Sequence, residues 1–251
     1  MRTLLVIPAR LASTRLPEKL LRTAGGKSIL QHTYESAQRA NAVDEIVIAV
    51  DDERLAEAAD SFGARWVMTS VDCPSGTDRI AEVAEAFTDA DIFVNVQGDE
   101  PEIDPAIVDS VTQLLKDHPE ADIATAGVPI QEMDRLDDPG CVKIVMASEE
   151  SRAVYFSRAA VPFCRDGLDE QSLKSDPPMF WHHLGLYSYR RDFLLWFARQ
   201  PPSPLEQMEK LEQLRAVEAG KTVLVARAAS ATLGIDTEDD LQSFIHRVDA
   251  R

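Results

Sequence analysis

The sequence predicts an α/β fold with a mostly parallel sheet flanked by helices. Residues 4–7 and 45–50 are predicted to form strands buried on both faces, and residues 65–68 a third, short strand. Segments with helical spacing separate these strands, as the β-α-β units of a parallel sheet require. From about residue 122 strand-like segments follow one another directly, which predicts an antiparallel lobe inserted over about residues 122–215.

The length and composition indicate one sizeable domain over residues 1–251. The hydrophobic content of 45% suits a well-packed core, and no apolar run approaches the roughly 18 residues of a membrane span. Met1 lies just before the first strand, which leaves no room for a signal peptide. Cys73, Cys141 and Cys164 are odd in number and far apart, so neither a disulfide framework nor a zinc site is expected. These features predict a reduced, cytoplasmic protein without membrane insertion.

The charge is large and unevenly distributed. A formal net charge of −17 argues against nucleic-acid binding, because phosphates would be repelled overall. The segment 2–27 nevertheless carries several basic residues against the single acid Glu18. A basic island in an acidic protein indicates a small anionic ligand bound at one place.

The first strand leads directly into that basic island. Pro8 cannot donate a ladder hydrogen bond, so the strand is expected to end there. The loop that follows combines small and hydroxylated residues with Arg10, Arg15 and Lys19. Small residues let an anion approach backbone N–H groups, and the cations supply opposing charge, as a triphosphate needs. A solvated surface loop is the alternative, but α/β sheets bind ligands at the carboxyl ends of their strands, which favours a site.

The next elements continue the alternation of a Rossmann-like sheet. A turn at 24–27 precedes a helix over about 29–37, for which Ser28 is the expected N-cap. After the third strand, a polar loop leads into another helix, for which Thr77 is the expected N-cap. Ser75 and Gly76, just before that helix, could contact a base or a phosphate.

A second informative stretch follows a buried strand at about 91–97. Gly98 allows a tight turn, and Asp99 presents a carboxylate from the carboxyl end of the strand. Magnesium takes oxygen ligands, usually one or two carboxylates with waters and substrate phosphates, so Asp99 is a candidate ligand. The alternative role, capping the next helix at Pro105, suits Asp104 better.

The last third of the chain predicts several further elements. A strand over 182–189 places His183 and Tyr187 on one face, while the polar segment 165–178 is expected to form a mobile loop. Asp236 stands at a strand-to-helix junction, where an acid at a helix start is the common role. The other expected elements are strands at 122–129, 142–147, 153–158 and 222–226, a turn at 137–140, one amphipathic helix from Leu205 to Val217 closed by Gly220, and a final helix capped by Thr237.

Taken together, these stretches resemble the 3-deoxy-manno-octulosonate cytidylyltransferase family, the CMP-Kdo synthetases. The stretch from Ile7 to Leu20 resembles the family signature I-P-A-R-x-x-S-T-R-x-P-x-K, part of which other sugar nucleotidyltransferases share. Later stretches match in family order over nearly the whole chain. They are 75–79, 94–101, 155–158, 183–187, 204–206, 211–215 and 234–237.

The resemblance implies a transfer of CMP from CTP to Kdo, which gives CMP-Kdo and pyrophosphate and activates Kdo for lipopolysaccharide biosynthesis. It implies Mg2+ as cofactor, held by Asp99 and Asp236, and a catalytic group formed by these two residues with Arg10 and Lys19. The implied CTP-binding residues are Pro8, Ala9, Arg10, Ser13, Thr14, Arg15, Lys19, Ser75, Gly76, Arg79, Gln97 and Gly98.

The resemblance also implies a sugar site and a partner. Arg158, His183, Tyr187, Glu212 and Gln213 would surround Kdo, with Arg158 as the candidate for its carboxylate. The inserted lobe and the amphipathic helix would form a homodimer. Two other functions remain open: a cytidylyltransferase for another acidic sugar, such as an amino-substituted Kdo or sialic acid, and a catalytically silent nucleotide-binding regulator.

Overall fold

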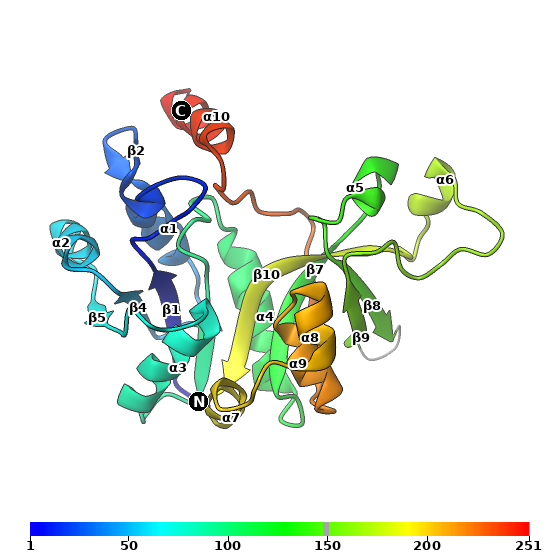
Figure 1. Cartoon of the computed structure of the whole chain (residues 1–251), viewed down its shortest axis with the longest axis horizontal. Helices are drawn as coiled ribbons and strands as arrows, with labels where there is room; N and C mark the ends of the chain where they lie inside the picture. Colours follow the sequence, from blue (N-terminus) through cyan, green and yellow to red (C-terminus); the bar gives the residue numbers. More distant parts are fainter. Residues whose placement is uncertain (148–150, 251) are drawn as a thin grey trace.

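The protein is built on a nine-stranded mixed sheet, shown in the computed structural model of Figure 1, which describes residues 1–147 and 151–250. The spatial order of the strands is β5 (Trp66–Met68), β4 (Glu45–Val50), β1 (Thr3–Ala9), β6 (Ile92–Asn95), β10 (Trp181–Arg190), β7 (Ile123–Pro129), β11 (Val223–Arg227), β9 (Arg152–Ser157) and β8 (Lys143–Ala147). A separate hairpin pairs β2 (Thr23–Ala24) with β3 (Lys27–Ser28) through the predicted turn, in which Gly25 and Gly26 both have positive φ.

The strand directions confirm the α/β class, but the sheet is mixed and not mostly parallel as expected. β1 pairs in parallel with β4 and β6, and β11 pairs in parallel with β7. β10 runs antiparallel between β6 and β7, hydrogen-bonded to both. The antiparallel strands β8, β9 and β10 are therefore part of the same sheet, and β10 joins its two halves.

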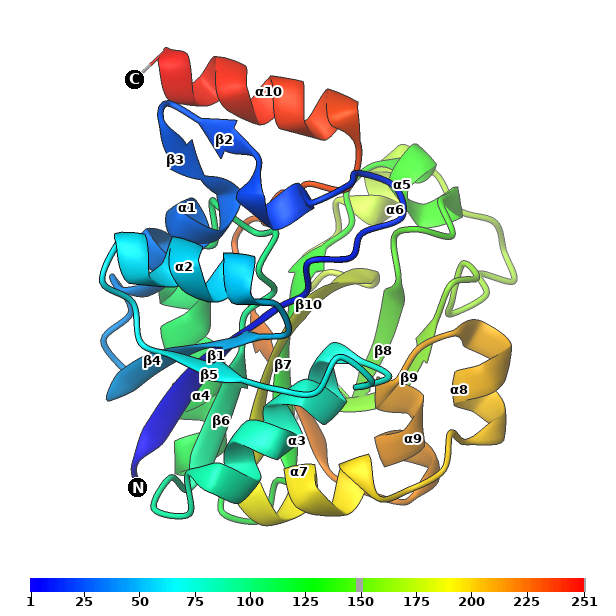
Figure 2. The same ribbon diagram turned by 60° about the vertical axis from the view of Figure 1, so that its left-hand side comes forward.

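Helices cover both faces of the sheet (Figures 1 and 2), and alternate side chains of β1 enter two separate cores. Leu5 and Ile7 pack on the face of α1, α2, α4 and α10, whereas Leu4 and Val6 pack on the face of α3, α7 and α9. The helices of the first face are α1 (Ile29–Ala37), α2 (Glu53–Ser61), α4 (Pro105–Asp117) and α10 (Glu238–Asp249). Those of the second are α3 (Gly76–Ala86), α7 (Arg191–Ala198) and α9 (Gln213–Glu218).

Three of the four predicted N-caps are confirmed, and the fourth is wrong by two residues. Ser28, Asp104 and Thr237 each accept a hydrogen bond from a backbone N–H in the first turn of α1, α4 and α10. In α3 the N-cap is Ser75, whose backbone is extended and whose Oγ accepts from the N–H of Asp78 at 3.2 Å. Thr77 is therefore inside the helix.

The first strand passes through Pro8, which corrects its predicted end. Pro8 lies opposite Ala49 in the ladder with β4, and β1 continues to Ala9. On the other side β6 already ends at Asn95, and the Pro8 carbonyl faces Gly98. Because Pro8 stands beyond the end of that neighbouring strand, its missing N–H costs no ladder hydrogen bond.

The turn expected at 137–140 is present, closed by a hydrogen bond from the N–H of Cys141 to the carbonyl of Asp138 at 3.1 Å. The region around 130–180 also contains two short helices that were not predicted, one of them in the expected loop. They are α5 (Met133–Asp137) and α6 (Glu170–Leu173). Leu136 and Leu173 are buried in a small third core with Phe180. Single apolar side chains such as these can therefore anchor a segment whose sequence shows no periodic pattern.

The predicted long amphipathic helix is two short helices, which is a further correction. α8 (Pro204–Glu209) ends where Lys210 adopts the left-handed conformation, with φ 55°, and α9 begins at Gln213. The break lets Arg215 fold back and pair with Glu206 at 2.5 Å, with both side chains buried. The connecting turn is what brings Glu212 and Gln213 to the sheet edge.

Within residues 1–147 and 151–250, none of the helices has the length and apolar character needed to cross a membrane.

Candidate active site

Two adjoining cavities lie at the carboxyl ends of β1, β6 and their neighbours. The first, of about 250 Å³, holds residues that the resemblance assigns to CTP and is called the nucleotide-side cavity. It is lined by Pro8, Arg10, Ala12, Ser13, Lys19, Leu20, Gly76, Gln97, Gly98 and Asp99. The second, of about 270 Å³, holds residues that the resemblance assigns to Kdo and is called the sugar-side cavity. It is lined by Gly76, Thr77, Asn95, Gln97, His183, Gly185, Tyr187, Lys210, Leu211, Glu212 and Gln213. Gly76 and Gln97 belong to both cavities, so the two spaces meet there. The strand order reverses between β1 and β6, and such switch points are where open α/β sheets bind ligands.

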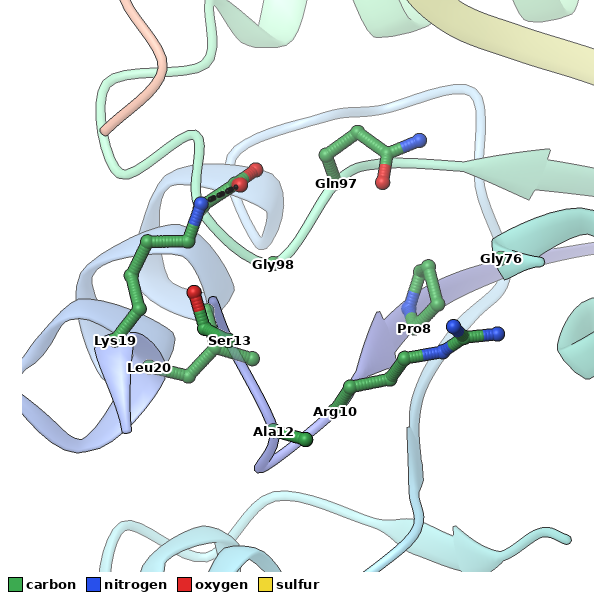
Figure 3. Close-up of a pocket in the computed structure, with 10 residues that line it drawn as sticks. Pro8, Arg10, Ala12, Ser13, Lys19, Leu20, Gly76, Gln97 and Gly98 are labelled. Atoms are coloured by element: carbon green, nitrogen blue, oxygen red, sulfur yellow. Dashed lines mark hydrogen bonds and ion pairs between the residues drawn. The ribbon is translucent and has the colours of Figure 1, made fainter. Parts of the chain in front are cut away.

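The basic loop after β1 provides one wall of the nucleotide-side cavity. Figure 3 shows Arg10 and Lys19 on opposite sides of the space, with Gly98 between them. The guanidinium of Arg10 donates to the carbonyl of Cys73, and its Nε is buried without a hydrogen-bond partner in the structure. The positive charges of Arg10 and Lys19 therefore lie on opposite sides of the cavity, which suits an extended ligand with several negative charges.

Lys19 connects two carboxylates from distant parts of the chain. Its ammonium lies 2.5 Å from Asp99 Oδ2 and 3.1 Å from Asp236 Oδ1. Arg15 also contacts Asp236, at 2.9 Å. Because one ammonium touches both carboxylates, Asp99 and Asp236 are close neighbours, as the resemblance implied.

The carboxylates of Asp99 and Asp236 are suitable ligands for magnesium, which takes one or two carboxylates together with substrate phosphates. In the described part of the chain, no three His, Cys, Asp or Glu side chains are grouped so that they could hold a metal by themselves. A cation held by Asp99 and Asp236 would therefore need oxygens from a ligand as well, which is how Mg2+ is usually bound with nucleotides.

Gly98 is required by a close approach between two strand ends. A Cβ at this position would lie 3.0 Å from the Pro8 carbonyl and 3.2 Å from Leu20. Thr33 donates to the Gly98 carbonyl at 2.9 Å and fixes the turn from the opposite side. This turn sets the direction of Asp99 toward Lys19.

The sugar-side cavity has an aromatic wall from β10. The His183 ring lies 5.4 Å from that of Tyr187 and 5.1 Å from that of Phe156. Burial lowers the pKa of His183 to about 3, and its Nε2 lies 3.0 Å from Thr125 Oγ1, so the ring is neutral at physiological pH. Burial also raises the pKa of Tyr187 well above its ordinary value. Both groups are thus uncharged hydrogen-bonding partners.

Two buried polar atoms in this cavity have no partner in the structure. They are Asn95 Oδ1, an acceptor, and Gln213 Nε2, a donor. Glu212 is partly engaged, because its Oε2 accepts from Thr77 Oγ1 at 2.8 Å. Unpaired buried polar atoms are costly, so their concentration at a cavity indicates a polar ligand such as a sugar.

Most of the residues implied by the resemblance line these cavities. In the nucleotide-side cavity they are Pro8, Arg10, Ser13, Lys19, Gly76, Gln97, Gly98 and Asp99. In the sugar-side cavity they are His183, Tyr187, Glu212 and Gln213.

Five residues assigned to CTP lie outside the lining. Ala9 is fully buried in the core, Thr14 is exposed, and Ser75 is occupied as the N-cap of α3. The remaining two are charged: Arg15 reaches the cluster only through Asp236, and Arg79 is completely buried on Asp51.

Arg158 is also placed differently from its predicted role. Its guanidinium donates to three backbone carbonyls, those of Glu209 at 2.7 Å, Pro139 at 2.9 Å and Lys210 at 3.4 Å. The side chain therefore braces the turn between α8 and α9, and Arg158 is not among the residues that line the sugar-side cavity.

Several lining residues were missed by the sequence analysis. Asn95 and Thr77 lie inside stretches that match the family, so those stretches were the available signal. Lys210 carries no such signal, because it enters the cavity only through the break between α8 and α9. The other missed residues are Ala12, Leu20, Gly185 and Leu211.

Comparisons with known proteins identify the family of the chain. The profile of the cytidylyltransferase family matches residues 4–223. The chain is 58% identical over 251 residues to a 3-deoxy-manno-octulosonate cytidylyltransferase from Rhodopirellula baltica, covering 100% of both chains. It is 45% identical to the enzyme of that name from Geobacter sulfurreducens, covering 97% of this chain and 98% of the other.

A solved structure is similar over the whole fold. It is that of CMP:2-keto-3-deoxy-manno-octonic acid synthetase complexed with CTP, with a TM-score of 0.91 and 37% identity, covering 100% of this chain and 99% of the other. A cytidylyltransferase from Leptospira borgpetersenii, 18% identical with a TM-score of 0.66, shares the fold. The match extends over the full length of the relatives, and the fold agrees. The chain therefore belongs to the 3-deoxy-manno-octulosonate cytidylyltransferase family.

Proposed function

We propose that this protein transfers CMP from CTP to Kdo, giving CMP-Kdo and pyrophosphate for lipopolysaccharide biosynthesis. The observation that carries the proposal is the junction of the two cavities at Gly76 and Gln97. One cavity offers cations for a triphosphate, and the other offers uncharged and unpaired polar groups for a sugar. Their junction is the place for the α-phosphorus of CTP and the anomeric hydroxyl of Kdo.

In this reaction the anomeric oxygen of Kdo forms a bond to the α-phosphorus, and the bond from that phosphorus to the bridging oxygen of the β-phosphate breaks. Pyrophosphate leaves with the electron pair, and the hydroxyl proton is released. The displacement depends on positioning and on neutralising charge. Arg10 and Lys19 would bind the triphosphate, and Lys19 would stabilise the departing pyrophosphate. Bound at Asp99 and Asp236, Mg2+ would supply further positive charge to the phosphate oxygens.

We propose that Lys210 binds the carboxylate of Kdo, in place of the role first assigned to Arg158. Lys210 is the one cationic residue in the lining of the sugar-side cavity, as far as the described residues show. Its left-handed backbone, braced by Arg158, is unusual for a residue with a side chain and supports a role in the site. The residues from about 122 to 215 would then form most of the binding site for Kdo.

The experiment that tests the function is pyrophosphate release, measured with CTP, Mg2+ and a panel of acidic sugars. We expect release only when Kdo or a close analogue and the divalent metal are both present. Faster turnover with sialic acid or an amino-substituted Kdo would support the alternative acidic sugar. CTP binding without turnover on any sugar would support the silent regulator and contradict the proposal.

Lys210→Met is expected to raise the KM for Kdo by about tenfold, because a charge-assisted hydrogen bond to the carboxylate is lost. CTP affinity measured by calorimetry without sugar should stay unchanged. Lys174→Met removes an exposed lysine of the same region and serves as the control. A normal KM for Kdo in Lys210→Met would remove this residue from the sugar site.

We also propose that the protein is a cytoplasmic homodimer, formed through the face around β8 and β9. Three large apolar side chains are exposed there: Phe163 is 86% exposed, Val154 48% and Met179 44%. Nearby Pro162, Pro177 and Trp181 line a further small cavity. An exposed apolar patch of this kind is typical of an interface between subunits.

Phe163→Glu is expected to shift the protein from dimer to monomer, because a carboxylate would have to be desolvated in the interface. Light scattering measures the change against the chain mass of 27.8 kDa. Met68→Glu, at an exposed apolar position of β5 at the other end of the sheet, is the matched control and should leave the mass unchanged. A wild-type protein of monomeric mass would contradict the proposal.

A further inference from the structure

Arg79 and Asp51 form a buried ion pair beneath the nucleotide-side cavity. The Arg79 side chain is completely buried, that of Asp51 is 7% exposed, and the two lie 3.1 Å apart. Arg79 also donates to the Thr69 hydroxyl, which itself donates to the carbonyl of Val50 at 2.8 Å. Because burying two charges is expensive, a pair held this firmly is expected to have a further role.

The second oxygen of Asp51 reaches the basic loop. Asp51 Oδ1 accepts a hydrogen bond from the backbone N–H of Leu11 at 2.9 Å, while its Oδ2 faces Arg79. Leu11 stands between Arg10 and Ser13, which both line the nucleotide-side cavity. One carboxylate therefore ties helix α3 to the loop that would hold the triphosphate.

Helix α3 forms the opposite wall of the same cavity. It begins at Gly76, about one turn before Arg79, and Gly76 lines both cavities. Arg10 makes a second connection between the two walls by donating to the carbonyl of Cys73. The separation between the basic loop and the start of α3 is thus set by the Arg79–Asp51–Leu11 chain together with the Arg10 contact.

We propose that Asp51 and Arg79 are positioning residues for the nucleotide. They hold the Leu11 amide, and through it Arg10 and Ser13, at the distance from α3 that CTP requires, without touching CTP themselves. The inference rests on the proposed function, since the ligand between the two walls is the nucleotide. It differs from the role that the family resemblance implied for Arg79, which was direct contact with CTP.

The test compares CTP affinities, measured by calorimetry without Kdo, for Asp51→Asn, Arg79→Met, Arg79→Lys and the double variant Asp51→Asn/Arg79→Met. The amide of Asp51→Asn presents an N–H donor to Leu11 or to Arg79, so one of the two contacts is lost. Asp51→Asn and Arg79→Met are each expected to weaken CTP binding by about tenfold. Since both act through one chain of contacts, the double variant should be no weaker than the worse single variant. Arg79→Lys keeps the charge and should stay closer to the wild type.

Hydrogen exchange at the segment containing Leu11 provides a readout that a purely stabilising role would not change. Exchange there should be faster in every variant with weakened CTP binding, measured well below the unfolding temperature. Arg79→Lys, the mildest change, keeps this comparison available if the charge-removing variants do not fold. Failure of the wild-type protein to bind CTP would contradict the proposed function. Hydrogen exchange at Leu11 would still show whether Asp51 and Arg79 hold the Leu11 amide in place.

Asp122→Asn is the matched control, because Asp122 makes the same two kinds of contact at the opposite edge of the sheet. It accepts from Lys221 at 3.2 Å and from the N–H of Thr222 at 3.0 Å. This variant should lose stability and keep its CTP affinity. If the losses of CTP affinity in Arg79→Met and Asp51→Asn add up in the double variant, Arg79 contacts the nucleotide independently of Asp51, which would overturn the proposal. Wild-type affinity in both single variants would overturn it as well.

Discussion

Asp99→Asn and Asp236→Asn are each expected to lower kcat by about a hundredfold or more. Each change keeps the shape of the side chain and removes one negative charge from the pair around Lys19. The metal would then be held more weakly where charge develops on the transferred phosphate, and metal ions contribute several kcal/mol to such transition states. Steady-state kinetics over a series of Mg2+ concentrations measures the effect, and the variants should need more Mg2+ than the wild type.

The control for this pair lies one turn away. Asp239 is an exposed acid in the first turn of α10, so Asp239→Asn should leave kcat and the Mg2+ requirement near normal. Circular dichroism and thermal unfolding verify that the variants are folded. Near-normal turnover in Asp236→Asn would return Asp236 to the ordinary role of an acid near a helix start.

Lys19→Ala is expected to reduce kcat by a comparable factor, again about a hundredfold, and to weaken CTP binding less. The Lys19 side chain is only 12% exposed and its ammonium contacts two carboxylates, so its charge is poorly screened and acts at short range. If it acts chiefly on the departing pyrophosphate, its contribution is larger in the transition state than in the bound substrate. Comparison of kcat with the calorimetric affinity for CTP separates the two effects.

Arg22→Ala is the matched control for Lys19. Arg22 belongs to the same basic segment, but it pairs with Glu238 at 3.2 Å and both side chains are well exposed. Its removal should change neither kcat nor CTP affinity appreciably, because exposed ion pairs contribute little. An unchanged kcat in Lys19→Ala with a large loss of CTP affinity would make Lys19 a simple binding residue.

Helices α5, α6 and α7 were not predicted, but the main strands, the N-caps of α1, α4 and α10 and the location of the nucleotide-side cavity could be predicted from the sequence. Each depends on neighbours in the chain: the uniform hydrophobicity of Glu45–Val50, the capping side chains of Ser28 and Thr237, and the basic loop directly after β1. The alternation along β10 was likewise predicted, and it places His183 and Tyr187 on one wall. These patterns are local, so local physical chemistry is sufficient to read them.

The partners of the charged side chains could not be predicted in the same way. Arg79 is an ordinary member of a polar motif until Asp51 and Thr69, from the ends of two other strands, surround it. Arg158 looked suitable for a carboxylate, but three of its N–H groups donate to backbone carbonyls, those of Pro139 and of the turn after α8. An arginine binds a ligand or stabilises the fold according to which groups lie within hydrogen-bond distance, about 3 Å, of its guanidinium. Those groups come from distant segments, so the sequence alone does not identify them.

The sequence by itself determined the class of fold, the order of most elements and the group of residues at the carboxyl edge of the sheet, because periodicity and capping act over a few residues. The tertiary structure alone decided that β10 joins the two halves of one sheet, that the chain breaks at Lys210, and that Lys19 meets Asp236 across 217 positions of sequence. Those outcomes depend on hydrogen bonds and buried charges between distant segments, whose free energies are set only when the whole chain packs.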